Sequence, residues 1–161
     1  MPALSDRTVA VIGSGLDEHE DLARPVGELL ASLGVNLLTG GGGGVMRSVS
    51  RAFTRAKRTC GISIGIIPCR SEAERAVPKE GYPNEFVELA IYTHLPYSGR
   101  RGEDDLSRNH INILTSWAVI VLPGSFGTES EIALARRYGK PLIVFSTIAE
   151  VETKLRAILE K

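Results

Sequence analysis

The most constraining feature of the sequence is an apolar run that ends in a glycine-rich turn. Residues Val119–Leu122 are short and rich in β-branched side chains, which is typical of a strand buried on both faces. Pro123 ends the run, because proline has no N–H for a sheet ladder. Two glycines follow, and Thr128 and Glu131 then have the Thr-x-x-Glu spacing of a helix start. This order aims free backbone N–H groups and a helix dipole at one point, which suits an anion such as phosphate.

Strand and helix patterns alternate along the whole chain. Strands are expected at residues 8–13, 35–38, 62–67, 86–92, 118–122 and 141–145, and helices at 17–33, 45–57, 106–116, 128–138 and from 147 onward. The alternation predicts a single α/β domain over residues 1–161, a Rossmann-like, doubly wound parallel sheet with helices on both faces. With the common strand order 3-2-1-4-5-6, the loops after strands 2, 1, 4 and 5 would meet at one edge, where such folds bind ligands.

Several residues predict where these helices begin and end. Asp17 with Glu20, and Thr147 with Glu150, have the spacing of capping boxes. Gly34 is placed to end the first helix in a left-handed conformation.

Composition excludes some classes of partner. The chain has 19 Lys and Arg against 19 Asp and Glu, so bulk charge gives no support to a nucleic-acid partner. The arginines of the second helix region could still form a nucleic-acid stripe, but a solvated face or an oligomer contact is the stronger interpretation; they are Arg47, Arg51, Arg55 and Arg58. Two cysteines make neither a disulfide framework nor a four-ligand zinc site, and no metal site is expected. The sequence shows no signal peptide and no membrane-spanning run, which predicts a cytoplasmic protein without a membrane partner.

The glycine-rich turns do not match the common nucleotide motifs. Gly13-Ser14-Gly15 is followed by Glu18 where a dinucleotide fingerprint needs a third glycine. The run Gly40–Gly44 is followed by Val45-Met46 and not by the Gly-Lys-Ser/Thr of a P-loop. Five consecutive glycines could let the backbone approach a flat or bulky ligand, or could be a flexible turn.

Three segments together resemble a known superfamily. Residues 39–46, Ser107-Arg108-Asn109 and residues 123–131 are similar to the signatures of the LONELY GUY family and its relatives, whose motif is Pro-Gly-Gly-x-Gly-Thr-x-x-Glu. LONELY GUY enzymes hydrolyse the N-glycosidic bond of cytokinin nucleoside 5′-monophosphates. A second branch, the molybdenum cofactor carrier proteins, shares the fold and binds a phosphate-bearing pterin. Ser125 replaces the second motif glycine, and residues 108–112 and 132–141 are more similar to the carrier branch, as is the absence of the hydrolases' long C-terminal extension.

The resemblance implies a binding protein for a small phosphate-bearing, nucleotide-like ligand, with the molybdenum cofactor as possible cargo. The alternative is a nucleoside 5′-monophosphate phosphoribohydrolase, so whether the chain is an enzyme stays open. In the hydrolase interpretation Arg108 and Glu131 are the catalytic residues. The expected ligand-binding residues are Gly13, Ser14, Gly15, Gly40, Gly41, Gly42, Gly43, Gly44, Val45, Met46, Arg108, Asn109, Asn112, Pro123, Gly124, Ser125, Phe126, Gly127, Thr128 and Glu131.

Each principal site residue also has a structural interpretation. Glu131 could serve the reacting carbon or simply complete a capping box with Thr128. Arg108 could hold a phosphate or carboxylate bidentately, or could lie on the surface. Asn112, one helical turn from Arg108, could donate to the ligand or to a neighbouring loop.

The sequence also predicts a homo-oligomer. The arginine-bearing helix and the helix over residues 129–137 carry charges that could pair across a two-fold axis, and the apolar part of the 94–105 loop could cover a neighbouring subunit's site. Light scattering at micromolar concentration should give at least a dimer. A mass near 17.4 kDa that does not change on dilution would contradict this prediction.

Overall fold

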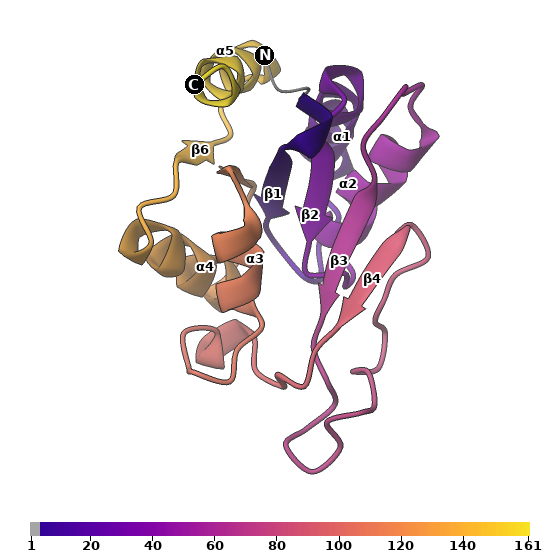
Figure 1. Ribbon diagram of the computed structural model, residues 1–161, viewed down its shortest axis with the longest axis vertical. Coiled ribbons are helices and arrows are strands. Elements are labelled where there is room, and N and C mark those ends of the chain that lie inside the picture. Colours follow the sequence, from indigo (N-terminus) through magenta and orange to yellow (C-terminus); the bar gives the residue numbers. More distant parts are fainter. Residues whose placement is uncertain (1–3) are drawn as a thin grey trace.

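A six-stranded parallel sheet forms the centre of the molecule. The computed structural model describes residues 4–161. The strands are β1 (Thr8–Ile12), β2 (Asn36–Thr39), β3 (Ser63–Ile67), β4 (Leu89–Tyr92), β5 (Ala118–Val121) and β6 (Leu142–Val144). The helices are α1 (Glu20–Leu33), α2 (Val45–Arg55), α3 (Asn109–Thr115), α4 (Phe126–Arg137) and α5 (Ile148–Leu159), with short 3-10 helices at Leu4–Asp6 and Gly99–Arg101. The doubly wound α/β fold is confirmed (Figure 1).

The strand order differs from the expected one. The sheet runs β4-β3-β2-β1-β5-β6, so the fourth strand lies at the outer edge beside β3 and not between the first and fifth. The exposure of β4 explains this position, because Leu89, Ile91 and Tyr92 are partly open to solvent whereas β1 and β5 are buried throughout. A strand with one open edge needs fewer buried positions than a central strand.

The true order brings β1 and β5 together. Val9 lies opposite Ala118 and Ile12 opposite Val121. The chain progresses outward in one direction from β1 through β4, and in the other from β5 to β6, so the direction reverses between β1 and β5. Ligands of such folds bind at this reversal, outside the carboxyl ends of the strands.

Two apolar cores hold the helices against the sheet. One contains Leu30 of α1, Phe53 of α2 and Leu155 of α5. The other, on the opposite face, contains Ile12 of β1, Ile113 of α3 and Leu134 of α4. Helices α3 and α4 therefore cover one face and α1, α2 and α5 the other (Figure 1).

The predicted helix ends are right in two cases and wrong in two. Gly34 adopts φ +69° after α1, and the Thr147 side chain accepts the Glu150 N–H at the start of α5. Helix α1 begins at Glu20 after His19 at φ 41°, so Asp17 is not its cap. Helix α4 begins at Phe126, so Thr128 is already inside the helix and forms no capping box with Glu131. Both errors arise because Asp, Thr and Glu at this spacing occur within helices and loops as well as at helix starts.

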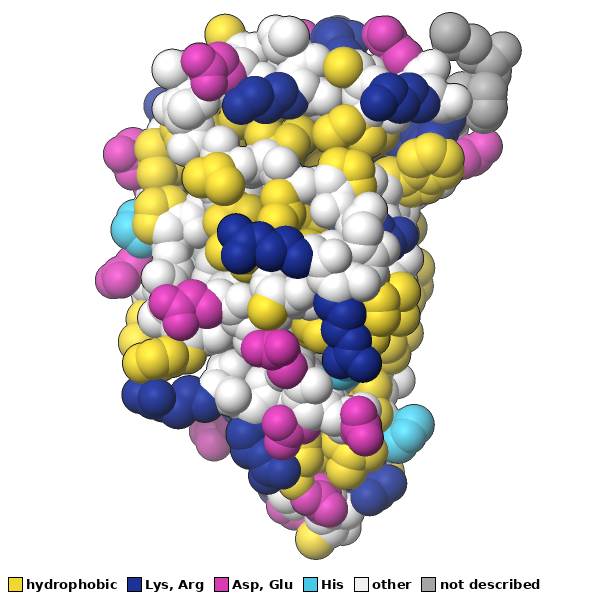
Figure 2. Space-filling view, turned by 90° about the vertical axis from the view of Figure 1, so that its left-hand side faces the viewer, with side chains coloured by type: hydrophobic (Ala, Val, Ile, Leu, Met, Phe, Trp, Pro, Cys, Tyr) yellow, Lys and Arg dark blue, Asp and Glu magenta, His cyan; other side chains and the backbone are white. Residues whose placement is uncertain are grey.

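Three of the four arginines around α2, namely Arg47, Arg51 and Arg58, are paired with carboxylates of the chain. Arg47 and Arg51 both donate to the carboxylate of Glu18, each at 2.8 Å, and Arg47 also binds Glu85. The hydrogen bond from Arg51 is the main cause that lowers the pKa of Glu18. On the side formed by α4 and α5, Figure 2 shows basic side chains interspersed with acidic and apolar ones. None of the helices in the described residues is long and apolar enough to span a membrane.

A close contact between α1 and α2 generates the first structural prediction. A Cβ on Gly27 would lie 2.7 Å from the Val49 carbonyl oxygen and 2.9 Å from the Phe53 nitrogen. Gly27→Ala should therefore destabilise the fold by about 1–3 kcal/mol, although alanine normally gains ~1 kcal/mol over glycine in a helix. Urea unfolding measures the change. Ser32→Ala, an exposed site on the same helix, is the control and should stay within about 0.5 kcal/mol of wild type. Equal or greater stability of Gly27→Ala would show that the helices are not held this close.

Candidate functional site

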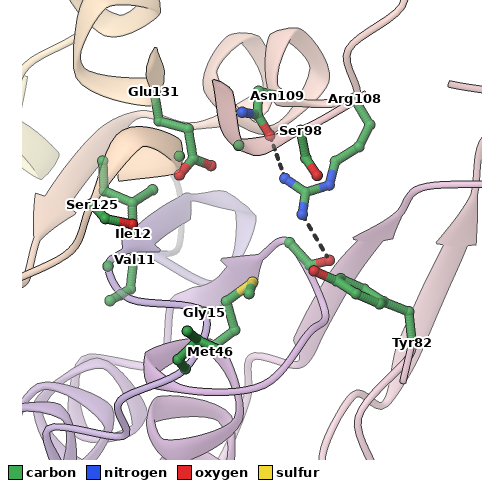
Figure 3. Close-up of a pocket in the computed structure, with 15 residues that line it drawn as sticks. Val11, Ile12, Gly15, Met46, Tyr82, Ser98, Arg108, Asn109, Ser125 and Glu131 are labelled. Atoms are coloured by element: carbon green, nitrogen blue, oxygen red, sulfur yellow. Dashed lines mark hydrogen bonds between the residues drawn. The ribbon is translucent and has the colours of Figure 1, made fainter. Parts of the chain in front are cut away.

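A cavity of about 300 Å³ lies at the reversal between β1 and β5. It is lined by Val11, Ile12, Gly13, Gly15, Leu16, Gly40, Met46, Tyr82, Ser98, Gly99, Arg108, Asn109, Ser125, Gly127 and Glu131 (Figure 3). The segments after β1, β2 and β5 thus converge as expected. The loop before α3 contributes as well, because α3 packs over β1.

The structure brings together about half of the residues expected from the sequence. Those that line the cavity are Gly13, Gly15, Gly40, Met46, Arg108, Asn109, Ser125, Gly127 and Glu131. Those outside its lining are Ser14, Gly41, Gly42, Gly43, Gly44, Val45, Asn112, Pro123, Gly124, Phe126 and Thr128. Ser14 illustrates the difference, since its hydroxyl accepts the N–H groups of Leu16 and Asp17 and so shapes its own turn.

Some lining residues were not expected. Tyr82 comes from the long connection between β3 and β4, and Ser98 and Gly99 come from the loop after β4. None of them belongs to a motif of fixed spacing, so only the tertiary arrangement reveals them. The glycine in Tyr97-Ser98-Gly99 was the one local sign that the backbone of this loop could lie close to another segment or to a ligand.

Arg108 is a buried residue and not a surface arginine. It is 4% exposed, directly precedes α3, and donates from Nη1 to the Asn109 side-chain oxygen. Its Nη2 lies 3.5 Å from the Gly40 carbonyl oxygen, while its Nε is buried without a partner. An unpaired buried donor is costly.

Glu131 faces the same cavity from α4 (Figure 3). It is 9% exposed, and Asn112 donates to its Oε1 at 3.2 Å. Burial raises the pKa of Glu131, and the attraction of Arg108 and the Asn112 hydrogen bond only partly oppose this effect. The helix-cap interpretation of Glu131 is excluded because α4 begins at Phe126.

Asn112 acts on Glu131 and not on the cavity directly. Its amide nitrogen holds the carboxylate, and its Oδ1 is buried without a partner. The sequence predicted a ligand donor or a loop contact, and in the structure Asn112 lies outside the cavity lining and orients Glu131.

The glycine run packs against protein along its length. A Cβ at Gly40 would fall 2.3 Å from Arg108 Nη2, at Gly42 it would meet the Tyr82 ring at 2.6 Å, and at Gly44 the Ser14 carbonyl oxygen at 2.2 Å. Asn84 donates to the Gly42 carbonyl at 2.8 Å. The run is therefore a pinned, buried segment rather than a flexible turn, and only Gly40 reaches the cavity.

The N-terminus of α4 forms another part of the cavity. Ser125 precedes the helix, makes no side-chain cap, and lines the cavity with Gly127. The first N–H groups of a helix have no partners within it and carry the positive end of the dipole. Together with Arg108 they make this end of the cavity suited to an anion. The described residues contain no group of three His, Cys, Asp or Glu placed to hold a metal ion.

Comparison with known proteins identifies the family. The SLOG cluster4 family model matches residues 6–160. The chain belongs to the SLOG cluster4 family. An uncharacterized protein of Archaeoglobus fulgidus is 32% identical over 158 residues, which cover 93% of this chain and 91% of that protein.

Solved structures of similar proteins agree with the resemblance that the sequence shows. The molybdenum cofactor binding protein of Rippkaea orientalis is 29% identical, with a TM-score of 0.64 over 95% of this chain and 83% of that one. The molybdenum cofactor carrier protein of Chlamydomonas reinhardtii has the same fold, with a TM-score of 0.75 at 23% identity over 96% of this chain and 99% of that one. The resemblance to the LONELY GUY and molybdenum cofactor carrier superfamily is thereby confirmed.

The buried carboxyl of Glu131 predicts a pH-dependent stability. Because its pKa is raised in the folded state, ionisation costs stability above the folded-state pKa, and this cost disappears as pH falls to the unfolded-state value. Glu131→Gln keeps the oxygen that Asn112 binds but cannot ionise. It should stabilise the protein at pH 8 by about 1 kcal/mol, or ~2–4 °C in Tm.

Melting curves of wild type and Glu131→Gln between pH 4 and pH 8 measure this difference, which should shrink toward the acid end. Glu129→Gln, an exposed change on the same helix, is the control. A Tm difference that does not vary with pH would argue against a raised pKa of Glu131.

Proposed function

We propose that the protein binds a small phosphate-bearing, nucleotide-like ligand in this cavity, in the manner of a molybdenum cofactor carrier. The observation that carries the proposal is the buried Arg108, which lines a cavity that also holds the start of α4. The relative from Rippkaea orientalis, a molybdenum cofactor binding protein, supports this choice of cargo. The volume of about 300 Å³ is at the small end of ligand pockets and suits a compact molecule.

The charges of the cavity indicate how an anion would be held. Arg108 and Glu131 carry opposite charges, so the lining has little net charge when Glu131 is ionised. An anion would then be bound by hydrogen-bond donors that point toward it. These donors are the guanidinium of Arg108, the first N–H groups of α4 and the hydroxyls of Ser98 and Ser125. Directed donors in a partly dry site discriminate by geometry more than by bulk charge.

A second function is favoured by Glu131. A buried carboxyl with a raised pKa is suited to give a proton to a leaving base, or to stabilise an oxocarbenium-like centre once ionised. In the corresponding hydrolysis the N-glycosidic bond breaks, the water oxygen bonds to C1′, and one water proton ends on the released base. The second candidate is therefore a nucleoside 5′-monophosphate phosphoribohydrolase.

Calorimetric titration of the purified protein with molybdenum cofactor and with AMP tests the binding proposal. Arg108→Ala should weaken binding about 10–100-fold, since a hydrogen bond to a charged group contributes about 1.5–3 kcal/mol. Arg136→Ala, an exposed arginine at the far end of α4, is the control and should bind as wild type does. No binding of either ligand by wild type, or undiminished binding by Arg108→Ala, would refute the proposal.

The same AMP samples separate carrier from hydrolase. Chromatography for free adenine should show none if the protein only carries its ligand. Adenine release that is lost in Glu131→Gln would establish the second function, whereas release that persists in that variant would remove Glu131 from the reaction.

A further inference from the structure

The loop after β4 is fixed across the first turn of α4. The Ser130 hydroxyl donates to the Gly99 carbonyl oxygen at 3.1 Å, and the Gly99 Cα lies 3.4 Å from the position that a Cβ on Gly127 would take. Gly102 is pressed against Ser130 in the same way, since a Cβ there would lie 2.1 Å from its hydroxyl. Ser98 and Gly99 line the cavity, and Arg100 follows them directly in the chain without being part of the lining.

Arg100 stacks on Phe126, the first residue of α4. Its guanidinium carbon lies 3.5 Å from the centre of the Phe126 ring, and both side chains are exposed. Within residues 4–161, none of the ion pairs involves Arg100. Stacking uses the flat face of the guanidinium and leaves its in-plane N–H donors free.

The adjacent arginine is a useful contrast. Arg101 also stacks, 3.5 Å from the Tyr97 ring, but its Nε donates to Asp104 at 2.7 Å. Arg101 is therefore already neutralised by a carboxylate, whereas Arg100 is not. The two residues have the same chemistry and neighbouring positions, yet only Arg100 meets the start of α4.

The position of Arg100 is unfavourable without an anion. A cation near a helix N-terminus is repelled by the positive end of the dipole, and the usual occupant of such a place is negatively charged. A second cation belongs to the same cavity: Arg108 lines it, is 4% exposed, and has a buried Nε without a partner. An anionic group at the edge of the cavity would pair with Arg100 and remove the repulsion.

We propose that Arg100 is a specificity-determining residue that contacts the phosphate of the ligand at the edge of the cavity, with Phe126 holding its guanidinium in place. The protein thereby distinguishes a phosphorylated ligand from its dephosphorylated form. This inference rests on the proposed function, because it names the group of that ligand which Arg100 recognises. Arg108 holds the ligand deeper in the cavity, and Arg100 selects for the phosphate.

The test compares AMP with adenosine as probes, by calorimetry on the full chain. Arg100→Ala should weaken AMP binding about tenfold and leave adenosine within about twofold, as expected for loss of one charge-assisted contact. Arg101→Ala, the matched control, should change neither affinity by more than about twofold. Phe126→Leu should weaken AMP binding less than Arg100→Ala does, because the charge remains while its orientation is lost. Melting temperatures check that each variant is folded.

The outcomes separate this inference from the proposed function. Suppose that wild type binds AMP and that Arg100→Ala either binds AMP equally well or loses affinity for AMP and adenosine equally. Arg100 then does not recognise the phosphate, and the proposed function stands. If wild type binds neither AMP nor adenosine nor molybdenum cofactor, both proposals fail.

Discussion

The guanidinium of Arg108 occupies the space that a side chain at position 40 would fill, and the rest of the cavity is arranged around this contact. A buried cation needs partners, and Arg108 has the Asn109 oxygen, a long contact to the Gly40 carbonyl and the nearby carboxylate of Glu131. Each partner comes from a different segment. The loop after β2 must approach α3, and α4 must present Glu131, before the charge is compensated. The same contacts between segments therefore build the cavity and compensate the buried charge of Arg108.

The sequence was sufficient to predict the α/β class and the buried central strands, because these depend on local chemistry. The apolar runs of β1 and β5, Gly34 and Thr147 were interpreted correctly. The place of β4 was not predictable from alternation, since strand pairing is decided by burial across the whole sheet. The glycine run left two interpretations open for a related reason, and of its residues Gly40 lines the cavity. Glycines that accommodate Tyr82 and Arg108 have the same sequence pattern as glycines that accommodate a ligand.

The two candidate functions make different demands on Glu131. A buried carboxyl with a raised pKa costs stability when it is ionised. In a carrier it would accept hydrogen bonds from the cargo and, when ionised, exclude ligands that place a second negative charge beside it. In a hydrolase it would act on the reacting carbon or the leaving base. Asn112 supports either role, because it fixes the carboxylate without occupying the cavity.

The pairing of β1 with β5 has a consequence for synthesis of the chain. Strands β1 to β4 and helices α1 and α2 are complete before any residue of α3, β5 or α4 is made. That part can pair its own strands, yet it holds only one wall of the cavity, since Arg108, Ser125 and Glu131 all come later. Contacts between such distant residues form late and slowly. The complete set of cavity walls therefore exists only after translation has passed α4.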